Sequence, residues 1–420
     1  MGKENGLNRM ITEKTETLAV EKEGVSKNIE ISNPQITKGH DGFLTVSYPI
    51  ISPIFPDNLT FKISSKYESF IDESLNCALV ALILPAMRSG SGIILNGNVS
   101  ERLFSSCQGS LQSIVKIVLG YEPVPIVSNG SFTDNVRVKE NFIVTGFSGG
   151  IDSYSVLKDH YFQSGERKSK INALVFNDVG ANGTTVERDL FESRLYHARE
   201  GANAIGLPLI VIESNMDDFY SIYNDLHFFK THSFRNSAVA HLFSNTVSTY
   251  LYAASMSYSE VKVGPSNTIG FVDPIALPLL SSENLYLQSE GAQYSRSEKI
   301  TAVVDLKVVQ NHLHVCVDHH VDGNCSVCQK CVRTLLIIDF LGRLENFSNV
   351  FDLDKYLAVK NKRLILLISK NDNFGRDIKL FAKKSGVNFS ASLLVRLKVL
   401  ILYNNTKRII KMVSRAVLGE

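Results

Sequence analysis

The chain has 420 residues, of which 44% are hydrophobic and 20% are charged, so it can bury substantial cores. This composition excludes a disordered or fibrous protein, and the length predicts two or three domains. Forty-four Lys and Arg residues against 42 Asp and Glu residues give a formal net charge of +2. The chain as a whole therefore has no strong attraction to nucleic acid or anionic lipid.

The apolar segments argue against a membrane protein. The longest uninterrupted apolar run, CALVALILPAM at residues 77–87, is about half of the roughly 20 residues that a membrane-spanning helix needs. Residues 1–28 contain no apolar stretch of the kind found in a secretory signal. We therefore expect a cytoplasmic protein whose cysteines stay reduced.

The sequence pattern changes several times along the chain. Residues 1–42 are polar and predict a tail or loosely attached arm. Residues 43–138 contain segments in which β-branched and aromatic residues alternate with polar ones, and segments with helical periodicity. They predict an N-terminal α+β accessory domain. Residues 139–310 alternate strands with helices, which predicts an α/β domain whose parallel sheet has helices on both faces. A four-cysteine zinc module is expected at residues 311–345, and a helical C-terminal region at residues 346–420.

A glycine-rich loop follows the first strand of the predicted parallel sheet. The strand NFIVTGF leads into SGGIDS at residues 148–153, where an amphipathic helix begins. Two glycines let backbone N–H groups approach phosphate oxygens, and the helix N-terminus adds positive potential. Because ligands bind outside the carboxyl ends of parallel strands, the loop predicts a polyphosphate site. The alternative is a plain strand-to-helix turn in which Asp152 caps the helix.

The segment FSGGIDSYSVL, residues 147–157, resembles the PP-loop of the N-type ATP pyrophosphatase superfamily, which has an adenine nucleotide alpha hydrolase-like (HUP) fold. The Gly-Lys-Ser/Thr ending of a Walker loop is missing. The resemblance implies cleavage of ATP between its α and β phosphates, transfer of AMP to a substrate oxygen and attack of a nucleophile on the adenylate. It further implies that Ser148, Asp152 and Ser153 are catalytic, with Asp152 helping to hold Mg²⁺. The implied nucleotide-binding residues are Phe147, Ser148, Gly149, Gly150, Ile151, Asp152 and Ser153.

Four of the six cysteines fall within 16 positions, at Cys316, Cys325, Cys328 and Cys331. In a reducing compartment such a cluster indicates a metal site, and four soft ligands suit a tetrahedral structural Zn²⁺. An iron–sulfur cluster and four unrelated cysteines are the alternatives. A neighbouring histidine could also replace one thiolate; the candidates are His312, His314, His319 and His320.

The spacing C-x8-C-x2-C-x2-C after an SGGIDS loop resembles the 7-cyano-7-deazaguanine synthase family, which forms a nitrile. The pair Arg235-Asn236 is similar to that family's arginine–asparagine pair at the head of a helix after the third strand. The resemblance implies that both residues belong to the nucleotide and substrate pocket, and that Asp178 contacts the adenosine. We expect Arg235 near the reacting carboxylate, because a guanidinium holds a carboxylate bidentately. Otherwise Arg235 pairs with a surface acid, Asn236 caps the helix and Asp178 is a loop residue.

The resemblance covers about residues 141–340, and the family's usual substrate loop is missing between Gly264 and Lys299. We therefore expect a ligase that adenylates a carboxylate or amide-like oxygen and couples it to a nitrogen nucleophile. Its substrate would be a 7-deazaguanine, or a larger molecule such as a protein carrying the acceptor group. The N-terminal domain is expected to share the substrate pocket, so that deleting residues 1–130 spares ATP binding and abolishes turnover.

Residues 391–420 have a local basic excess and predict either a docked helix with a solvated face or a surface for an acidic partner, RNA or a membrane. The basic side chains are those of Arg396, Lys398, Lys407, Arg408, Lys411 and Arg415. The protein could also form a homodimer. Two other functions compete: a non-catalytic ATP-binding assembly protein, and a tRNA-modifying PP-loop enzyme. Thiolation of tRNA would need a cysteine near the nucleotide loop, and residues 141–315 contain none.

Overall fold

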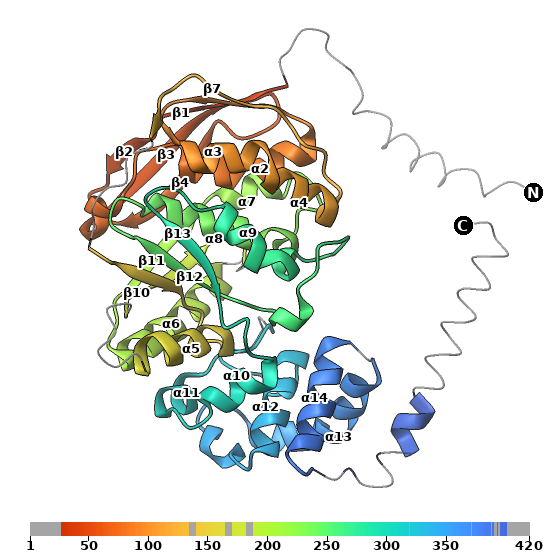
Figure 1. Cartoon of the computed structure of the whole chain (residues 1–420). Helices are drawn as coiled ribbons and strands as arrows, with labels where there is room; N and C mark the ends of the chain where they lie inside the picture. The colour runs from red at the N-terminus through yellow and green to blue at the C-terminus, as the bar shows by residue number, and fades with distance from the viewer. Residues whose placement is uncertain are drawn as a thin grey trace, which may run out of the picture.

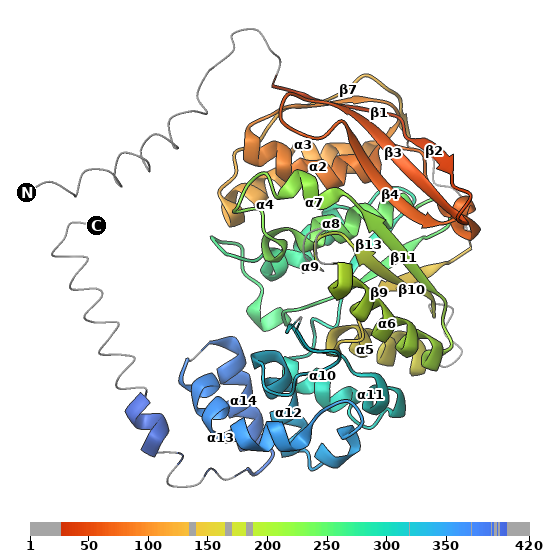
Figure 2. The ribbon, with the colours of Figure 1, turned by 180° about the vertical axis from the view of Figure 1, so that it is seen from behind.

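The computed structural model describes residues 27–133, 140–163, 170–181, 188–318, 320–370, 372–387, 389, 393 and 395–400. Most of the predicted N-terminal tail, residues 1–26, lies outside these ranges, as do His319 and the basic residues 401–420. Figures 1 and 2 show a sheet with helices packed on it and, beside it, a layer of C-terminal helices. No helix in the described ranges combines the length and the apolar character needed to cross a membrane.

Among the described residues, one eleven-stranded sheet runs through both the N-terminal region and the α/β region. A short two-stranded sheet joins β6 (Val99–Ser100) to β8 (Phe132–Thr133). The order across the large sheet is β13 (Tyr286–Glu290), β12 (Thr249–Ala253), β9 (Ile143–Gly146), β10 (Ile171–Asp178), β11 (Leu209–Ser214), β4 (Asn58–Ser64), β3 (Phe43–Ile51), β1 (Ile29–Ser32), β5 (Ile93–Asn96) and β7 (Ile126–Ser128), with β2 (Gln35–Lys38) paired to β3.

The predicted α/β architecture is confirmed for the strands β13 to β11, which are all parallel. Successive side chains of a strand point to opposite faces of the sheet. In β10, Ala173 and Val175 belong to one buried core while Leu174 and Phe176 belong to the other. Both faces are therefore covered by helices, which explains the nearly continuous apolar run in this strand.

The helices divide between the two faces. One core holds α2 (Asn76–Ser89), α7 (Met216–Tyr220), α8 (Phe228–Leu242) and α9 (Asp273–Leu279), with α3 (Glu101–Gln108) and α4 (Ser110–Leu119) nearby. The other holds α5 (Ile151–Leu157), which runs on as a π-helical turn over Lys158–Phe162, and α6 (Arg188–Ile205), α10 (Arg296–Val303), α11 (Lys307–His312), α12 (Gln329–Phe340), α13 (Leu353–Ser369) and α14 (Asn373–Lys384). In Figures 1 and 2, α10 lies between α5 and the C-terminal helices.

The N-terminal region shares its sheet and its core with the α/β region instead of folding beside it. Strand β4 pairs antiparallel with β11, with Ile63 opposite Ile212. Helix α2 packs against α8, and the Tyr220 hydroxyl donates a hydrogen bond to the carbonyl of Ala81 at 2.8 Å. Described residues on both sides of the expected boundary, up to Ile126 and from Val144 onward, belong to one buried core. Because β10 and β11 separate β4 from β9, the N-terminal strands support the α/β region from its far edge.

This continuity predicts the outcome of a truncation. A fragment of residues 131–420 should be insoluble or lack cooperative unfolding, because it exposes the edge of β11 and the apolar side of α8. The soluble fraction and the near-ultraviolet circular dichroism of the fragment and the full chain provide the measurement. A soluble fragment with a cooperative thermal transition would contradict the shared core and restore the expectation of a separate domain.

Candidate functional site

The glycine loop lies where the strand order of the parallel sheet reverses. After β9 the chain adds β10 and β11 on one side, and then returns to add β12 and β13 on the other. At such a reversal the connecting helices leave in opposite directions and open a crevice at the carboxyl ends of the strands. The predicted position of a ligand site at this edge therefore coincides with the crevice between β9 and β12.

Local contacts fix the loop backbone. Gly149 has a φ of +72°, which favours glycine, and its carbonyl accepts a hydrogen bond from the backbone N–H of His314 at 2.9 Å. The hydroxyl of Ser153, which is 4% exposed, donates to the carbonyl of Gly150 at 2.9 Å. Ser148 is exposed, whereas Phe147 is buried behind the loop. Of the two loop serines, Ser148 is thus the one available to a ligand.

Asp152, in the first turn of α5, faces two cations from α10. Arg296 donates to Oδ2 at 2.8 Å and Lys299 donates to Oδ1 at 2.9 Å. The Lys299 ammonium also donates to the carbonyl of Ala254, and its side chain is only 3% exposed. Burial of the Asp152 carboxyl opposes ionisation, but the two cations outweigh it and hold its pKa well below the usual range. Asp152 is therefore an anion that balances two cations.

Further cations surround this pair. Burial among the helices, followed by the charges of Arg333 and Arg296, lowers the pKa of Lys330 to about 8. Lys330 is nevertheless exposed, so its ammonium lies in a crowded position that water still reaches. Burial and the charge of Arg296 likewise lower the pKa of Arg333 to about 10. Arg194 of α6 adds a fifth positive charge close enough to affect Lys330.

These cations are not among the site residues that the motifs predict, although the sequence contains signals for them. Ser295 and Glu298 form a capping box that starts α10, and this fixes Arg296 and Lys299 one turn apart on the helix. Lys330 lies within the second Cys-x2-Cys pair and Arg333 lies two residues after it, so a metal module would place both with the helix that begins there. What the sequence cannot indicate is that all of them converge on Asp152.

The expectations for Arg235 need correction. The pair with Asn236 lies in the middle of α8 and not at its head, and Arg235 is 1% exposed. Its guanidinium donates to the carboxylate of Asp217 and the carbonyl of Val179, both at 2.7 Å, and also to Thr231 and the carbonyl of Leu226. With its donors directed at protein groups, Arg235 cannot orient a substrate carboxylate in this conformation.

Asp178 and Asn236 lie at the predicted edge. Asp178 ends β10 and is half-buried. The amide of its neighbour Asn177 donates to Oδ1 of Asn236 at 2.8 Å, and the Asn236 amide donates to the carbonyl of His232. Asn236 thus links the end of β10 to α8 and does not cap the helix.

The four clustered cysteines lie together. Their sulfur atoms are all within 4.8 Å of one another, with 3.9 Å between Cys316 and Cys328 and 4.0 Å between Cys325 and Cys331. Backbone N–H groups point at these sulfurs, including those of Asp318, Cys325, Cys328 and Cys331. Four thiolates with N–H donors suit a tetrahedral metal ion such as zinc.

The described histidines near this cluster have other partners. His314 stacks on His197 with ring centroids 4.7 Å apart, and its Nε2 lies 3.3 Å from the carbonyl of Gly323. His197 in turn contacts Asp322. Within the described residues, no histidine belongs to the group that could hold the ion. The segment that carries Cys316 also donates to the glycine loop through His314, so the metal module and the loop are in direct contact.

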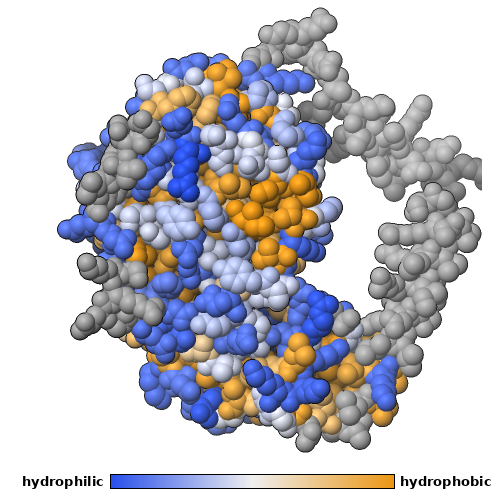
Figure 3. Space-filling model, viewed as in Figure 1, coloured by the Kyte–Doolittle hydropathy of each residue, from blue (hydrophilic) through white to orange (hydrophobic). Residues whose placement is uncertain are grey.

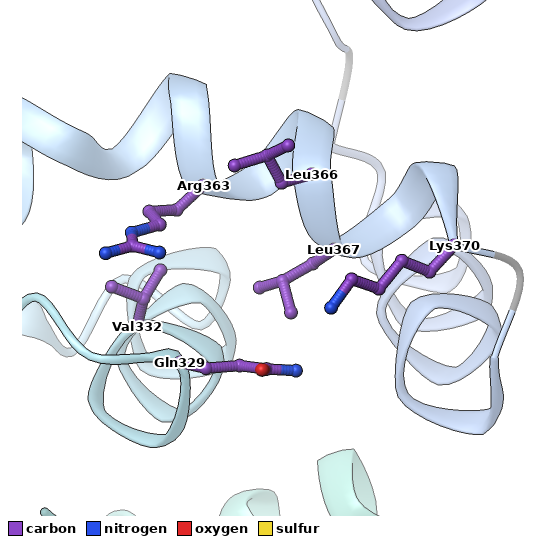
Figure 4. A pocket seen from close by; sticks show the side chains of 6 residues that line it. All are labelled: Gln329, Val332, Arg363, Leu366, Leu367 and Lys370. Carbon is purple, nitrogen blue, oxygen red and sulfur yellow. The ribbon is translucent and has the colours of Figure 1, made fainter. Parts of the chain in front are cut away.

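A hollow of about 240 Å³ lies between α12 and α13 (Figure 4). Its lining residues are Gln329, Val332, Arg363, Leu366, Leu367 and Lys370. None of them belongs to the loop or to the cations around Asp152. We therefore place the candidate site by its chemistry, at the crevice, and not by the size of this hollow.

Comparison of the chain with family models, curated proteins and solved structures finds no match. The resemblance to PP-loop enzymes therefore rests on the motifs of the chain itself.

The cysteine geometry predicts about one zinc ion per chain, because four thiolates complete a tetrahedral site. Cys328→Ser should lose the metal and lower the melting temperature, since binding energy of a structural zinc is also folding energy. Elemental analysis and thermal denaturation test this. Cys107→Ser, at a buried thiol outside the cluster, is the control and should keep its metal. Full metal occupancy in Cys328→Ser would refute the assignment.

Asp152→Asn should lower the free energy of unfolding by about 2 kcal/mol at neutral pH, because Lys299 loses its anionic partner. This is less than a fully buried pair would lose, since the Asp152 side chain is 27% exposed. The lowered pKa of Asp152 means that its contribution is present above its unfolded pKa, about 4, and is lost as the pH falls below that value. Urea unfolding should thus show that the free energy of unfolding falls less steeply in the variant than in the wild type as the pH is lowered from neutral to acidic. Equal slopes would contradict the pairing.

Proposed function

We propose that the protein is an ATP-dependent adenylating enzyme that forms AMP and pyrophosphate. The observation that carries this proposal is a group of cations beside the glycine loop: Arg296 and Lys299 pair with Asp152, Lys330 and Arg333 lie within its electrostatic range, and Arg194 lies near Lys330. Like charges repel, so such a group is costly unless an anion neutralises it. A triphosphate has the charge to do so, and the loop supplies backbone N–H donors for its oxygens.

The same residues suit the departure of pyrophosphate. Cations and N–H groups held in place before the reaction stabilise charge as it develops on a leaving group, without reorganising. When phosphate oxygens pair with Arg296 and Lys299, the carboxylate of Asp152 is released from them. Asp152 would then hold Mg²⁺, which neutralises phosphate charge. Ser148 is placed to donate its hydroxyl to a phosphate oxygen, while Ser153 shapes the loop.

On the adenosine side, we assign Asp178 and Asn236 to the nucleotide, since both lie at the carboxyl end of β10 next to the crevice. The group to be adenylated would be a carboxylate or amide-like oxygen, on a 7-deazaguanine or on a larger molecule such as a protein. The product then couples to a nitrogen nucleophile. Arg235 supports this region from the core of α8 and does not contact the substrate.

The competing functions make different use of the same residues. A non-catalytic ATP-binding protein would need the cations, but it would release ATP unchanged. A tRNA-thiolating enzyme would need a nucleophilic cysteine, and the thiols nearest the loop are those gathered into the metal cluster, where a bound metal would suppress their reactivity.

A homodimer would form through the apolar surface over α4 and α9 that is visible in Figure 3, where Ile117 and Ile275 are exposed.

The test is the pair of products formed from ATP. With Mg²⁺ and either a 7-deazaguanine carboxylate or a metabolite extract, chromatography should show AMP and pyrophosphate. Arg333→Gln should slow their formation about 100-fold, which is typical for loss of one preorganised donor to a developing charge. Arg343→Gln, at an exposed arginine paired with Asp305, is the matched control and should keep full activity. Formation of ADP and phosphate alone would refute the proposal.

A further inference from the structure

A chain of hydrogen-bonded side chains lies on the β12 side of the crevice, opposite the glycine loop. The hydroxyl of Ser233 donates to Oδ1 of Asp273, and its oxygen lies 3.0 Å from Nδ1 of His232. The same ring nitrogen lies 2.6 Å from the hydroxyl of Tyr252. Ser233 and Asp273 are fully buried, His232 is 8% exposed and Tyr252 is half-buried. The chain therefore leads from the partly exposed Tyr252 and His232 to a buried carboxyl group.

The rings of His232 and Tyr252 meet edge to edge. Their planes differ by 11° and their centroids are 6.1 Å apart, which is close to the longest separation that the 2.6 Å hydrogen bond permits. The imidazole is thus held with Nδ1 toward Ser233 and Tyr252 and with Nε2 on the other side. Nε2 faces Gly270, where a Cβ atom would lie 3.6 Å from the nitrogen. That Cβ atom would lie 2.8 Å from the Ser255 hydroxyl, so the close contact at Gly270 is with Ser255. No hydrogen-bond partner for Nε2 is found among the described residues.

The donors and acceptors in this chain fit two states that differ by one proton. With Asp273 ionised, the Ser233 hydroxyl donates to Asp273, and Nδ1–H of His232 is shared between the oxygens of Ser233 and Tyr252, which both accept from it. Nε2 is then an unprotonated base. With Asp273 protonated, every donor reverses: Asp273 donates to Ser233, Ser233 donates to Nδ1, and the proton of the ring is on Nε2. A proton that arrives at Nε2 can therefore reach Asp273 without leaving a charge on the imidazole.

We propose that His232, Ser233 and Asp273 form a proton relay that deprotonates the nitrogen nucleophile, ammonia or a primary amine, as it attacks the adenylate. This rests on the adenylation proposed above. A nitrogen–carbon bond forms while one N–H proton passes to Nε2, the Nδ1 proton passes to Ser233 and the Ser233 proton passes to Asp273. The carbon–oxygen bond to AMP breaks, and its electron pair leaves on the phosphate oxygen of AMP.

The position of the relay agrees with this role. Tyr252 is on β12, which pairs with β9 immediately before the glycine loop, so the relay and the loop flank one crevice. The charge of Asp152 contributes to the raised pKa of Tyr252, which places the two groups within electrostatic range. Oδ2 of Asp273 has no hydrogen-bond partner within the described part of the chain. A buried carboxyl that is only half satisfied is a poor structural anchor, but it is a suitable proton acceptor.

The titratable groups around the relay have suitable protonation states. Burial raises the pKa of Asp273 to about 7, which the hydrogen bond from Ser233 opposes. Burial and the charge of Arg235 lower the pKa of His232 to about 4, so the imidazole stays neutral. The other groups that act on the relay are Tyr252 from β12 and, through it, Asp152 from α5. A base whose pKa lies near the working pH is largely unprotonated and still binds a proton strongly enough to drive its transfer.

Nuclear magnetic resonance of ¹⁵N-histidine tests the relay without any substrate. Between about pH 5.5 and 8.5, the ring of His232 should stay neutral while its proton moves from Nε2 to Nδ1, with a midpoint near the pKa of Asp273. Asp273→Asn and Ser233→Ala should abolish this change. Ser237→Ala, at a buried hydroxyl one turn along α8 that has no hydrogen-bond partner among the residues that the structure describes, is the matched control and should retain it. A fixed tautomer in the wild type, or a charged imidazolium, would refute the relay.

Two kinetic measurements then separate the relay from the adenylation. ATP–pyrophosphate exchange reports adenylation alone, and Asp273→Asn should leave it within about twofold of wild type, whereas AMP release driven by ammonium chloride should fall about 100-fold. The wild-type rate should rise with pH through about 7, and the variant should lose that rise. Unchanged ammonium-driven release in Asp273→Asn, or an equal loss of exchange, would overturn the role of the relay. No exchange in the wild type would instead refute the adenylation, and the tautomer change would still decide whether the relay exists.

Discussion

The hydrogen bonds of Asp152 to Arg296 and Lys299 hold the candidate site together. Lys299 is almost completely buried, and a buried ammonium is unstable without a nearby anion. By pairing with Asp152 it fixes α10 against α5, and by donating to the carbonyl of Ala254 it also fixes α10 to the end of β12. One side chain thus joins both sides of the crevice. Without this pairing, Arg296 and Lys299 would lose the carboxylate that offsets their mutual repulsion.

The cysteine cluster has a second effect on the same charges. Cys328 caps α12, and Lys330 and Arg333 lie in the first turns of that helix. The spacing of the four sulfurs therefore sets where these two cations stand relative to Asp152. The hydrogen bond from the backbone N–H of His314 to the carbonyl of Gly149 fixes the position of the glycine loop relative to the same cysteine module. A structural metal at this position would influence phosphate binding without touching a phosphate, because it fixes the groups that do.

The elements that the sequence predicted well are those determined by local pattern. The parallel strands follow from apolar runs, the glycine loop from its own residues, and the cysteine cluster from its spacing. The errors concern long-range packing. Nothing in the β4 segment itself indicates that Ile63 pairs with Ile212, so the sequence predicts a separate N-terminal domain where the structure has an extension of the main sheet. Arg235 was assigned to the substrate because the sequence does not show that Asp217 and the carbonyl of Val179 use its donors.

The proposed adenylation and the proposed proton transfer make opposite demands on their surroundings and would interfere at one place. The glycine loop and the cations on its β9 side create a strongly positive potential, which favours phosphate but lowers the basicity of any nearby nitrogen or carboxylate. Asp152 shows this effect, since its pKa is held well below the usual range and it cannot serve as a base near neutral pH. Asp273 is also a buried carboxyl, but its neighbours are neutral hydroxyls and an imidazole, and its pKa is raised to about 7. Two carboxyl groups in one fold thus acquire opposite properties, because cations pair with one, whereas the other is buried beside a neutral hydroxyl.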